Sequence, residues 1–246
     1  MTKNLKSTSE FFRKNGYCIL KNQFSLQEVR DIIININKHI KKNQNNFEGS
    51  DINYINGEVN SLHNFKDNIF FDKFSKKNSL IDLTSNLLES KTTVKAVEYF
   101  AKPKKVGLAS PSHQDNYYWC LKKSKALTMW IALDHASKEN GSLFYYSGSH
   151  KLGIIPHEPS NAPGSSQTIK KDFYKKLSRR RTFVSLEPGD CLIHHCLSVH
   201  GSEKNVSSQG RRGFVIQYKS VEDTIDKNRY NKYRQSLDQQ VKQRTV

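Results

Sequence analysis

The chain has 246 residues, with 40 Lys and Arg against 23 Asp and Glu and a formal net charge of +17. This length is enough to bury a sizeable core, and the lack of internal repeats or a long linker predicts a single domain over residues 1–246. No apolar stretch approaches the length of a membrane helix and no charged-then-apolar leader opens the chain, so we expect a cytoplasmic protein without membrane contact.

The N-terminal part, about residues 1–90, predicts a helical layer. GYCIL at residues 16–20 is typical of a short buried strand. Ser25 opens the segment SLQEVRDIIININKHI, and Glu28 three residues later completes a capping box ahead of a helical apolar pattern. We expect this helix to end near the lysines at 41–42.

Residues 43–77 are polar, rich in Asn and broken by aromatic side chains, which favours loops and short helices. SLIDLTSNLLES predicts a second helix, and it leads into the strand VKAVEYF. Short strands and turns dominate about residues 91–220, whereas the basic tail at 221–246 predicts a solvated helix or partial disorder. The fold class is therefore mainly β with helical support, and we expect a jelly-roll barrel, the cupin-like double-stranded β-helix.

The segment PSHQDNYYW holds the first candidates for chemistry. If it is a strand, His113 and Asp115 point to the same face and can offer an imidazole nitrogen and a carboxylate oxygen to one ion. Tyr117 and Trp119 would share that face, where pocket lining and ordinary core packing are equally open for Trp119. Two histidines and one carboxylate form the facial triad of non-haem Fe(II) oxygenases. A His-x-Asp pair alone is weak evidence, because such short motifs occur by chance.

The segment PGDCLIHHCLSVHGSEKN offers the third ligand. A Pro-Gly-Asp turn feeds an apolar strand that we expect to end at His200. On that strand His194 shares the face of His200, whereas His195 does not. A histidine in an apolar strand is more often a packed core residue, so a ligand role for His200 depends on the other motifs. We expect His194 and His195 to be structural or to support the ligands.

An arginine pair follows. Gly210 and Gly213 bracket Arg211 and Arg212, which enter a strand over 214–218. We expect this strand to lie beside the one that ends at His200, so that one arginine reaches the same cavity. The planar guanidinium holds a carboxylate through two parallel hydrogen bonds, which suits an organic acid co-substrate.

Several segments together resemble the phytanoyl-CoA dioxygenase family of Fe(II)/2-oxoglutarate oxygenases: HQDNYYW, ALTMWIALDHASKENGSLFYYSGSHKLG and PGDCLIHHCLSVHGSEKN…RRG. FFRKNGYCILKNQFSLQEV resembles the family's opening strand and helix, so the resemblance runs from about Phe11 to Tyr218. It implies a jelly-roll enzyme that uses Fe(II), 2-oxoglutarate and O₂. The implied reaction couples decarboxylation of 2-oxoglutarate to succinate and CO₂ with C–H hydroxylation of a small molecule.

Carried over position by position, the resemblance makes His113, Asp115 and His200 the catalytic iron ligands. Arg211 becomes the anchor of 2-oxoglutarate, with Arg212 as the alternative. Related halogenases lack the carboxylate, so Asp115 favours hydroxylation over halogenation.

Three further residues are expected beside the co-substrate. In ALTMWIALD, strand alternation puts Thr128 and Trp130 on the face opposite Leu127, Met129 and Ile131, and the family's matching tryptophan position lines the co-substrate pocket. Ser202 lies two residues after His200, and its hydroxyl could reach the carboxylate that Arg211 binds. On the substrate side the weaker candidates are Trp119, Tyr117, His150 and Gln167.

His150 lies in a stretch that the family places near the pocket mouth, although a solvated loop histidine is the more common outcome. Gln167 follows a Gly/Ser-rich loop of the kind that caps active sites, although most such loops are plain connections. The four cysteines, Cys18, Cys120, Cys191 and Cys196, show no C-x-x-C spacing, and we expect them to be reduced.

Three classes of function stay open: a small-molecule hydroxylase, a nucleic-acid-binding protein or oxygenase, and a non-catalytic β-barrel binding module. An inert relative would have lost a ligand or the anchoring arginine, and all four positions are filled here. The positive charge is spread along the chain apart from a cluster at 170–181, and no nucleic-acid motif accompanies it, which disfavours nucleic acid as the partner. A basic rim would instead attract a small anionic substrate. The sequence predicts neither the oligomeric state nor the substrate.

Overall fold

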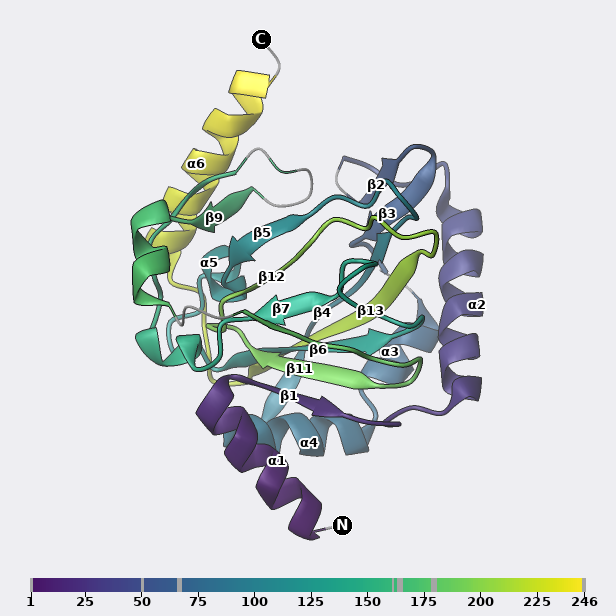
Figure 1. Cartoon of the computed structure of the whole chain (residues 1–246), viewed down its shortest axis with the longest axis horizontal. Helices are drawn as coiled ribbons and strands as arrows, with labels where there is room; N and C mark the ends of the chain where they lie inside the picture. The colour runs from purple at the N-terminus through teal and green to yellow at the C-terminus, as the bar shows by residue number, and fades with distance from the viewer. Residues whose placement is uncertain are drawn as a thin grey trace.

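Two facing antiparallel sheets form the β part of the molecule (Figure 1). The computed structural model describes residues 2–49, 51–65, 68–160, 162, 166–177 and 181–244. The larger sheet has seven strands in the order β1-β11-β6-β13-β4-β3-β2, and the smaller has four in the order β10-β7-β12-β5. The jelly-roll prediction is confirmed, although the described strands form a sandwich and do not close into a barrel. The strands are β1 Tyr17–Leu20, β2 Ile52–Ile55, β3 Glu58–Leu62, β4 Thr92–Lys102, β5 Ser110–His113, β6 Ala126–Ala132, β7 Leu143–Tyr145, β8 His157–Pro159, β9 Gln167–Ile169, β10 Thr182–Phe183, β11 Cys191–His195, β12 His200–Ser202 and β13 Arg211–Ser220.

Helices cover one face of the larger sheet. Ser25 caps α2 and its hydroxyl accepts the backbone N–H of Glu28, whose side chain accepts the backbone N–H of Ser25, so the predicted capping box is confirmed. The helix ends at Asn43, one residue beyond the predicted lysines. The helices are α1 Thr2–Asn15, α2 Leu26–Asn43, α3 Ile69–Ser75, α4 Asn78–Leu88, α5 Asp115–Trp119 and α6 Lys227–Arg244, with 3₁₀ turns η1 Ser149–Leu152 and η2 Lys171–Lys176.

Strand β6 shows how alternation divides the core. Leu127, Met129 and Ile131 pack toward α2, α3 and α4 in the main apolar cluster. Trp130, on the opposite face, packs in a second cluster between the two sheets, together with Tyr145 from the smaller sheet. This is the two-faced pattern predicted for ALTMWIALD. The inner face of the larger sheet is therefore free to build a cavity.

Two predicted elements differ from the structure. The segment 43–77 was expected to form loops and short helices, but it also holds the hairpin β2–β3, which extends the larger sheet beside β4. Its polar composition hides the strand pattern because the hairpin sits at a sheet edge. The strand expected to run from the Pro-Gly-Asp turn to His200 is two strands, since β11 belongs to the larger sheet and β12 to the smaller. The tail at 221–246 was predicted as a solvated helix or partial disorder, and the helix is confirmed over Lys227–Arg244.

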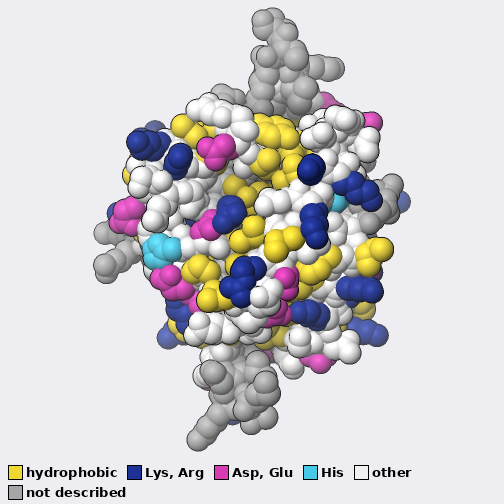
Figure 2. All heavy atoms as spheres, turned by 90° about the vertical axis from the view of Figure 1, so that its right-hand side faces the viewer, with side chains coloured by type: hydrophobic (Ala, Val, Ile, Leu, Met, Phe, Trp, Pro, Cys, Tyr) yellow, Lys and Arg dark blue, Asp and Glu magenta, His cyan; other side chains and the backbone are white. Residues whose placement is uncertain are grey.

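All four cysteines are buried and none forms a disulfide, as expected. Across the described ranges, none of the helices combines the length and the apolar character that crossing a bilayer requires. On the face drawn in Figure 2, Lys and Arg side chains lie scattered among acidic and apolar ones and do not form a single stripe. Arg179 and Arg180 of the basic cluster lie outside the described residues.

Close packing between β13 and β6 gives a prediction for stability. A Cβ atom added to Gly213 would overlap the indole of the buried Trp130. We therefore expect Gly213→Ala to lower the free energy of unfolding by about 1–3 kcal/mol, the usual cost of overpacking a core. Urea denaturation followed by circular dichroism measures this change.

Gly210→Ala is the matched control, because a Cβ at Gly210 would meet Lys102 O at an ordinary contact distance of 3.6 Å. Its effect should stay within about 0.5 kcal/mol, as for most surface substitutions. Equal free energies of unfolding for the two variants would contradict the packing argument.

Candidate metal centre

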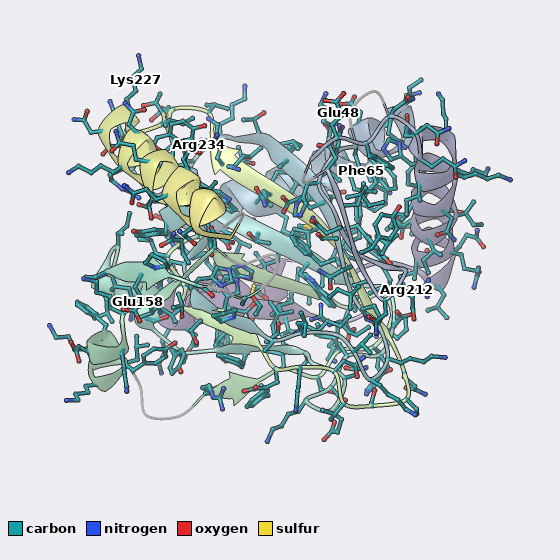
Figure 3. The ribbon with its side chains drawn as sticks, turned by 90° about the horizontal axis from the view of Figure 1, so that it is seen from above. Glu48, Phe65, Glu158, Arg212, Lys227 and Arg234 are labelled. Carbon is teal, nitrogen blue, oxygen red and sulfur yellow. The ribbon has the colours of Figure 1, made fainter. Side chains whose placement is uncertain are left out.

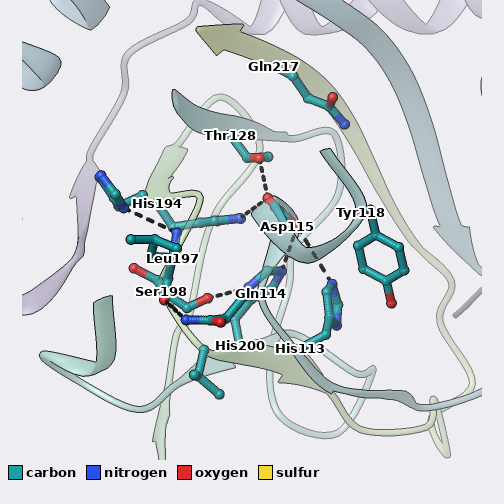
Figure 4. Close-up of polar contacts among 12 residues, drawn as sticks. His113, Gln114, Asp115, Tyr118, Thr128, His194, Leu197, Ser198, His200 and Gln217 are labelled. Atoms are coloured by element: carbon teal, nitrogen blue, oxygen red, sulfur yellow. Dashed lines mark hydrogen bonds and ion pairs between the residues drawn. The ribbon is translucent and has the colours of Figure 1, made fainter. Parts of the chain in front are cut away.

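Three side chains converge between the sheets (Figure 4). His113 is the last residue of β5, His200 is the first of β12, and the two face each other across the antiparallel ladder. Asp115 opens helix α5. Its Oδ1 atom lies 3.7 Å from His113 Nε2 and 3.6 Å from His200 Nε2, and one donor atom from each residue lies within 4.8 Å of the others. The predicted triad therefore comes together in space.

The prediction that His113 and Asp115 share a strand is wrong. The chain turns at Gln114, so the ligand pair spans a strand end and a helix start. Gln114 is fully buried, and its side-chain amide donates to Leu197 O at 2.7 Å and to Gly153 O at 2.8 Å. A glutamine with no exposure between two ligands fixes the turn that places them. No pattern in the sequence indicates this role.

Both histidines hold their second nitrogen on a backbone carbonyl. His113 Nδ1 donates to Pro111 O at 2.8 Å, and His200 Nδ1 donates to Ser198 O at 3.0 Å. Because each Nδ1 carries the proton, each Nε2 keeps its lone pair and points it at the cluster. This is the arrangement in which protein histidines ligate metals. The donor set fits a divalent transition metal with open positions.

The second carboxylate oxygen of Asp115 is held from the larger sheet. Thr128 Oγ1 donates to Oδ2 at 2.6 Å, and His194 Nε2 donates to it at 3.0 Å. His194 Nδ1 in turn accepts the hydroxyl of Tyr145 at 2.8 Å. His194 thus supports a ligand, as expected, although it reaches the site from β11 and not from the strand of His200.

Ionisation of these groups follows from their surroundings. Burial alone would raise the pKa of Asp115, but the three neighbouring histidines, acting through charge and hydrogen bonds, hold it well below its usual range. Burial lowers the pKa of His200 well below its usual value. Burial also raises the pKa of Tyr145 well above its ordinary value, so its hydroxyl stays a donor. The cluster thus holds an anionic carboxylate and, in His200, an imidazole that burial keeps from protonating, which is the protonation state that a metal needs.

The triad lines a cavity of about 610 Å³ between the sheets. Every residue expected beside the co-substrate reaches this cavity, and so does one of the substrate-side candidates. The predicted residues on its wall are His113, Asp115, Trp119, Thr128, Trp130, His200, Ser202 and Arg211.

Arg211 is the buried cation of this cavity, with only 3% of its surface exposed. Its Nη2 donates to Gly141 O at 2.7 Å, its guanidinium carbon lies 5.2 Å from the ring centre of Trp130, and its buried Nε has no partner among the described residues. Burial lowers the pKa of Arg211 to about 10, so it remains charged at neutral pH. A buried cation with an unused donor is suited to a ligand carboxylate.

Arg212 points away from the cavity. Its Nε and Nη2 atoms donate to the carboxylate of Asp134 at 2.8 and 2.7 Å, and Figure 3 places it at the margin of the molecule. Alternation along β13 thus separates the two arginines. The expectation that β13 lies beside the strand of His200 is wrong, because β13 and β12 belong to opposite sheets that face each other across the cavity.

A second basic side chain at the cavity, Lys102, was not predicted. It lies opposite Arg211 on β4, and its Nζ donates to Leu108 O at 2.6 Å and to Glu203 O. Burial, followed by the charge of Arg211, lowers the pKa of Lys102 to about 6. A lysine entering a loop gives no sequence signal, since only the sheet pairing brings it to the arginine.

Three substrate-side candidates lie off the cavity wall. Tyr117 stacks on His157 with ring centres 4.0 Å apart, because α5 turns it away from Asp115, and Tyr118 lines the cavity instead. His150 packs against α1, where its Nε2 lies 3.1 Å from Arg13 O. Gln167 is buried in β9, where its backbone carbonyl accepts the hydroxyl of Tyr118 at 3.2 Å.

The residues at the far end of the cavity were also not predicted from the sequence. Glu98 accepts from Gln217 Nε2 at 2.6 Å and lies 2.9 Å from His63 Nδ1, which together form a polar wall beside the β2–β3 hairpin. Tyr233 and Leu237 reach the wall from α6. Tyr233 and Leu237 come from the C-terminal tail, whereas Glu98 and Gln217 lie on predicted strands whose sheet neighbours the sequence does not show.

Known proteins are similar along most of the chain. A sequence model of the family described as phytanoyl-CoA dioxygenase (PhyH) matches residues 12–213. A probable phytanoyl-CoA dioxygenase of Caenorhabditis elegans is 26% identical over 85% of this chain and 73% of its own length. A probable alpha-ketoglutarate-dependent hypophosphite dioxygenase of Stutzerimonas stutzeri is 25% identical over 84% of this chain and 76% of its own length. The human peroxisomal phytanoyl-CoA dioxygenase aligns over 34% of its length, at 28% identity over 46% of this chain.

Solved structures share the fold. EctD from S. alaskensis, determined with 2-oxoglutarate and 5-hydroxyectoine, superposes with a TM-score of 0.74 at 19% identity and covers 89% of this chain and 77% of its own. The carbocyclase SnoK from nogalamycin biosynthesis superposes with a TM-score of 0.70 at 22% identity, over 89% of this chain and 85% of its own. With the family match spanning both metal-ligand segments and the arginine pair, the chain belongs to the phytanoyl-CoA dioxygenase family of Fe(II)/2-oxoglutarate-dependent oxygenases.

Proposed function

We propose that this dioxygenase hydroxylates a C–H bond of a small organic molecule held in the cavity between the two sheets. The observation that carries the proposal is the His113–Asp115–His200 cluster, whose donor atoms lie within 4.8 Å of one another and whose histidines both direct Nε2 inward. Fe(II) held by these residues would supply O₂ activation coupled to decarboxylation of 2-oxoglutarate. Asp115 occupies the position that a halide would need, which favours hydroxylation.

The co-substrate is assigned to the part of the cavity that Arg211 and Trp130 of the larger sheet line. Arg211 is proposed to hold the distal carboxylate of 2-oxoglutarate, because it is buried, charged and has an unused donor. Trp130 forms the adjoining wall, and Ser202 is within the same cavity as a further hydroxyl donor. Thr128 acts on Asp115, where its hydrogen bond fixes which carboxylate oxygen faces the histidines.

The substrate side is assigned to the opposite end of the cavity. Its size suits a small molecule. Glu98, His63 and Gln217 provide a polar wall, and Tyr118 and Trp119 an aromatic one, so the substrate is expected to carry both polar and apolar groups. Relatives of this fold differ in what they act on, so the substrate does not follow from the family. The net charge of +17 favours an anionic molecule.

The test is a screen for substrate-stimulated succinate formation with Fe(II), 2-oxoglutarate and O₂. The panel contains carboxylic acids, amines, phosphonates and acyl thioesters. One class should raise succinate release above the level seen without substrate, and mass spectrometry should find that class heavier by one oxygen atom. Absence of both metal binding and 2-oxoglutarate turnover would overturn the proposal. A steep fall of nucleic-acid affinity with salt would instead support the alternative partner.

Removal of a histidine ligand should weaken metal binding. We expect His113→Ala and His200→Ala each to lower the affinity for Fe(II), or for inert Mn(II), by at least about 10–100-fold, the loss typical even for residues that only support a ligand. Anaerobic calorimetry measures the affinity. His135→Ala is the control, because His135 is a surface histidine paired with Glu187. Unchanged affinity in both ligand variants would exclude this cluster.

The support of Asp115 gives a separate prediction. His194→Ala removes a hydrogen bond to Oδ2, so we expect about a 10-fold loss of Mn(II) affinity. Tyr145→Phe removes only the hydroxyl that donates to His194, so it should lower the Mn(II) affinity less. His195→Ala should leave the affinity unchanged, since the Nδ1 of His195 accepts from the backbone of Leu197. Equal affinities for the His194 and His195 variants would argue against this support.

The two arginines should differ in their effect on 2-oxoglutarate. Arg211→Ala should raise the KM for 2-oxoglutarate by roughly 10–100-fold, because a charge-assisted hydrogen bond contributes about 1.5–3 kcal/mol. Arg212→Ala should change the KM little, since Arg212 is paired with Asp134 outside the cavity. Succinate formation titrated against 2-oxoglutarate measures both. A larger effect from Arg212→Ala would reverse the assignment.

A further inference from the structure

The C-terminal helix α6 lies beside the cavity and beyond the end of the family match at residue 213. Figures 1 and 3 place it next to α5 and β9, across the molecule from α2. Tyr233 and Leu237 from this helix line the same cavity as His113 and Asp115. An element outside the matched region therefore contributes to the site.

The segment that leads into α6 is fastened to the chain just after α5. The carboxylate of Asp223 accepts the backbone N–H groups of Lys123 and Lys125 at 2.9 and 2.8 Å. The N–H of Asp226 donates to Cys120 O at 2.7 Å. Asp223 is 1% exposed, so these bonds are shielded from water and hold the start of the helix in one place.

Arg229 binds the helix that carries Asp115. Its Nη2 donates to Asn116 O at 2.9 Å and its Nη1 to Leu121 O at 3.4 Å. Asn116 O also accepts the backbone N–H of Cys120 at 3.0 Å, so the guanidinium adds a second, charged donor to this carbonyl. The contact couples the position of α6 to the position of α5.

Tyr233 closes an aromatic wall that reaches the metal cluster. Its ring meets Tyr118 edge to face, with centres 5.7 Å apart and planes at 88°. Tyr118 in turn meets the His113 ring at 5.5 Å. Edge-to-face rings add binding energy beyond the area they bury, so this wall has a defined position. Its side chains stand between α6 and the reacting end of the cavity.

We propose that α6 forms one wall of the substrate site, and that the ring of Tyr233, positioned by Arg229 and joined by Leu237, limits the size of the group that reaches the His113–Asp115–His200 cluster. The substrate it admits is one that presents a compact group to the metal. This inference rests on the proposed function for its meaning, because the wall selects a substrate only if the cluster is the reacting centre. The wall itself is tested independently of activity.

The chain contains a built-in reporter of this wall. Its two tryptophans, Trp119 and Trp130, both line the cavity, so intrinsic fluorescence senses access to it. We expect Tyr233→Ala to raise the quenching constant of acrylamide by about twofold or more, because an aromatic side chain covers about 150–250 Å². The quenching constant of a bulkier neutral quencher, the nitroxide 4-hydroxy-TEMPO, should rise by a larger factor than that of acrylamide.

Other substitutions in α6 distinguish loss of the Tyr233 ring from a general destabilisation of the helix. Tyr230→Ala is the matched control, since Tyr230 is exposed and off the cavity wall, and it should leave quenching unchanged. Tyr233→Phe should resemble the unsubstituted protein, because the ring rather than the hydroxyl forms the wall. Arg229→Ala should act like Tyr233→Ala and speed amide hydrogen exchange in α6.

The outcomes distinguish the two proposals. Calorimetry with Mn(II) followed by 2-oxoglutarate should give the same affinities for Tyr233→Ala and the unsubstituted protein, which shows that the metal site is intact. Equal quenching of Tyr233→Ala and Tyr230→Ala, with unchanged melting temperatures, would overturn the wall. Failure of the unsubstituted protein to bind either ligand would overturn the proposed function, whereas raised quenching in Tyr233→Ala would still support the wall.

Discussion

The carboxylate of Asp115 is the point at which the two sheets and the helix α5 meet. One oxygen is held by Thr128 and His194 from the larger sheet, and the other faces two histidines from the smaller sheet. A buried carboxylate is tolerated only when it is paired and hydrogen-bonded, so the spacing of the sheets and the charge of the site are set together. The distance between the sheets at the cavity matches the reach of the Asp115 carboxylate, which has partners on both sheets.

Side-chain alternation along β6 and β13 gives each strand one face toward the cavity and one face away from it. On β6 the residues that face the helices are apolar, whereas the inward Thr128 and Trp130 serve the cavity. On β13 the inward Arg211 is buried and its neighbour Arg212 is bound to Asp134 outside. A shift of one residue along the strand therefore separates the arginine proposed to bind the co-substrate from the arginine of a structural ion pair, without any change in residue type.

Much of the site could be predicted because its residues carry local signals. His113 stands in a His-x-Asp motif, His200 follows an apolar segment that begins at a turn, and the capped helix at Ser25 follows from a pattern within four residues. The predicted residues come together in the site, but the backbone structure predicted around them was partly wrong. The ligand pair was placed on one strand, but a strand end and a helix start bring His113 and Asp115 together, because buried Gln114 bonds to backbone groups far along the chain.

What could not be predicted depends on contacts between distant segments. Tyr117 and Trp119 were assigned to one face by a period of two, whereas a helix of five residues separates them, and a run that short shows no helical period. Lys102 and Glu98 enter the cavity only through sheet pairing. The clearest case is α6, whose polar sequence indicates solvent exposure. Arg229 nevertheless binds it to the helix of Asp115, and Asp223 binds the segment before α6 to the chain just after that helix. Since the family match ends before this helix, substitutions in α6 would alter the proposed substrate wall without touching the residues proposed to bind the metal.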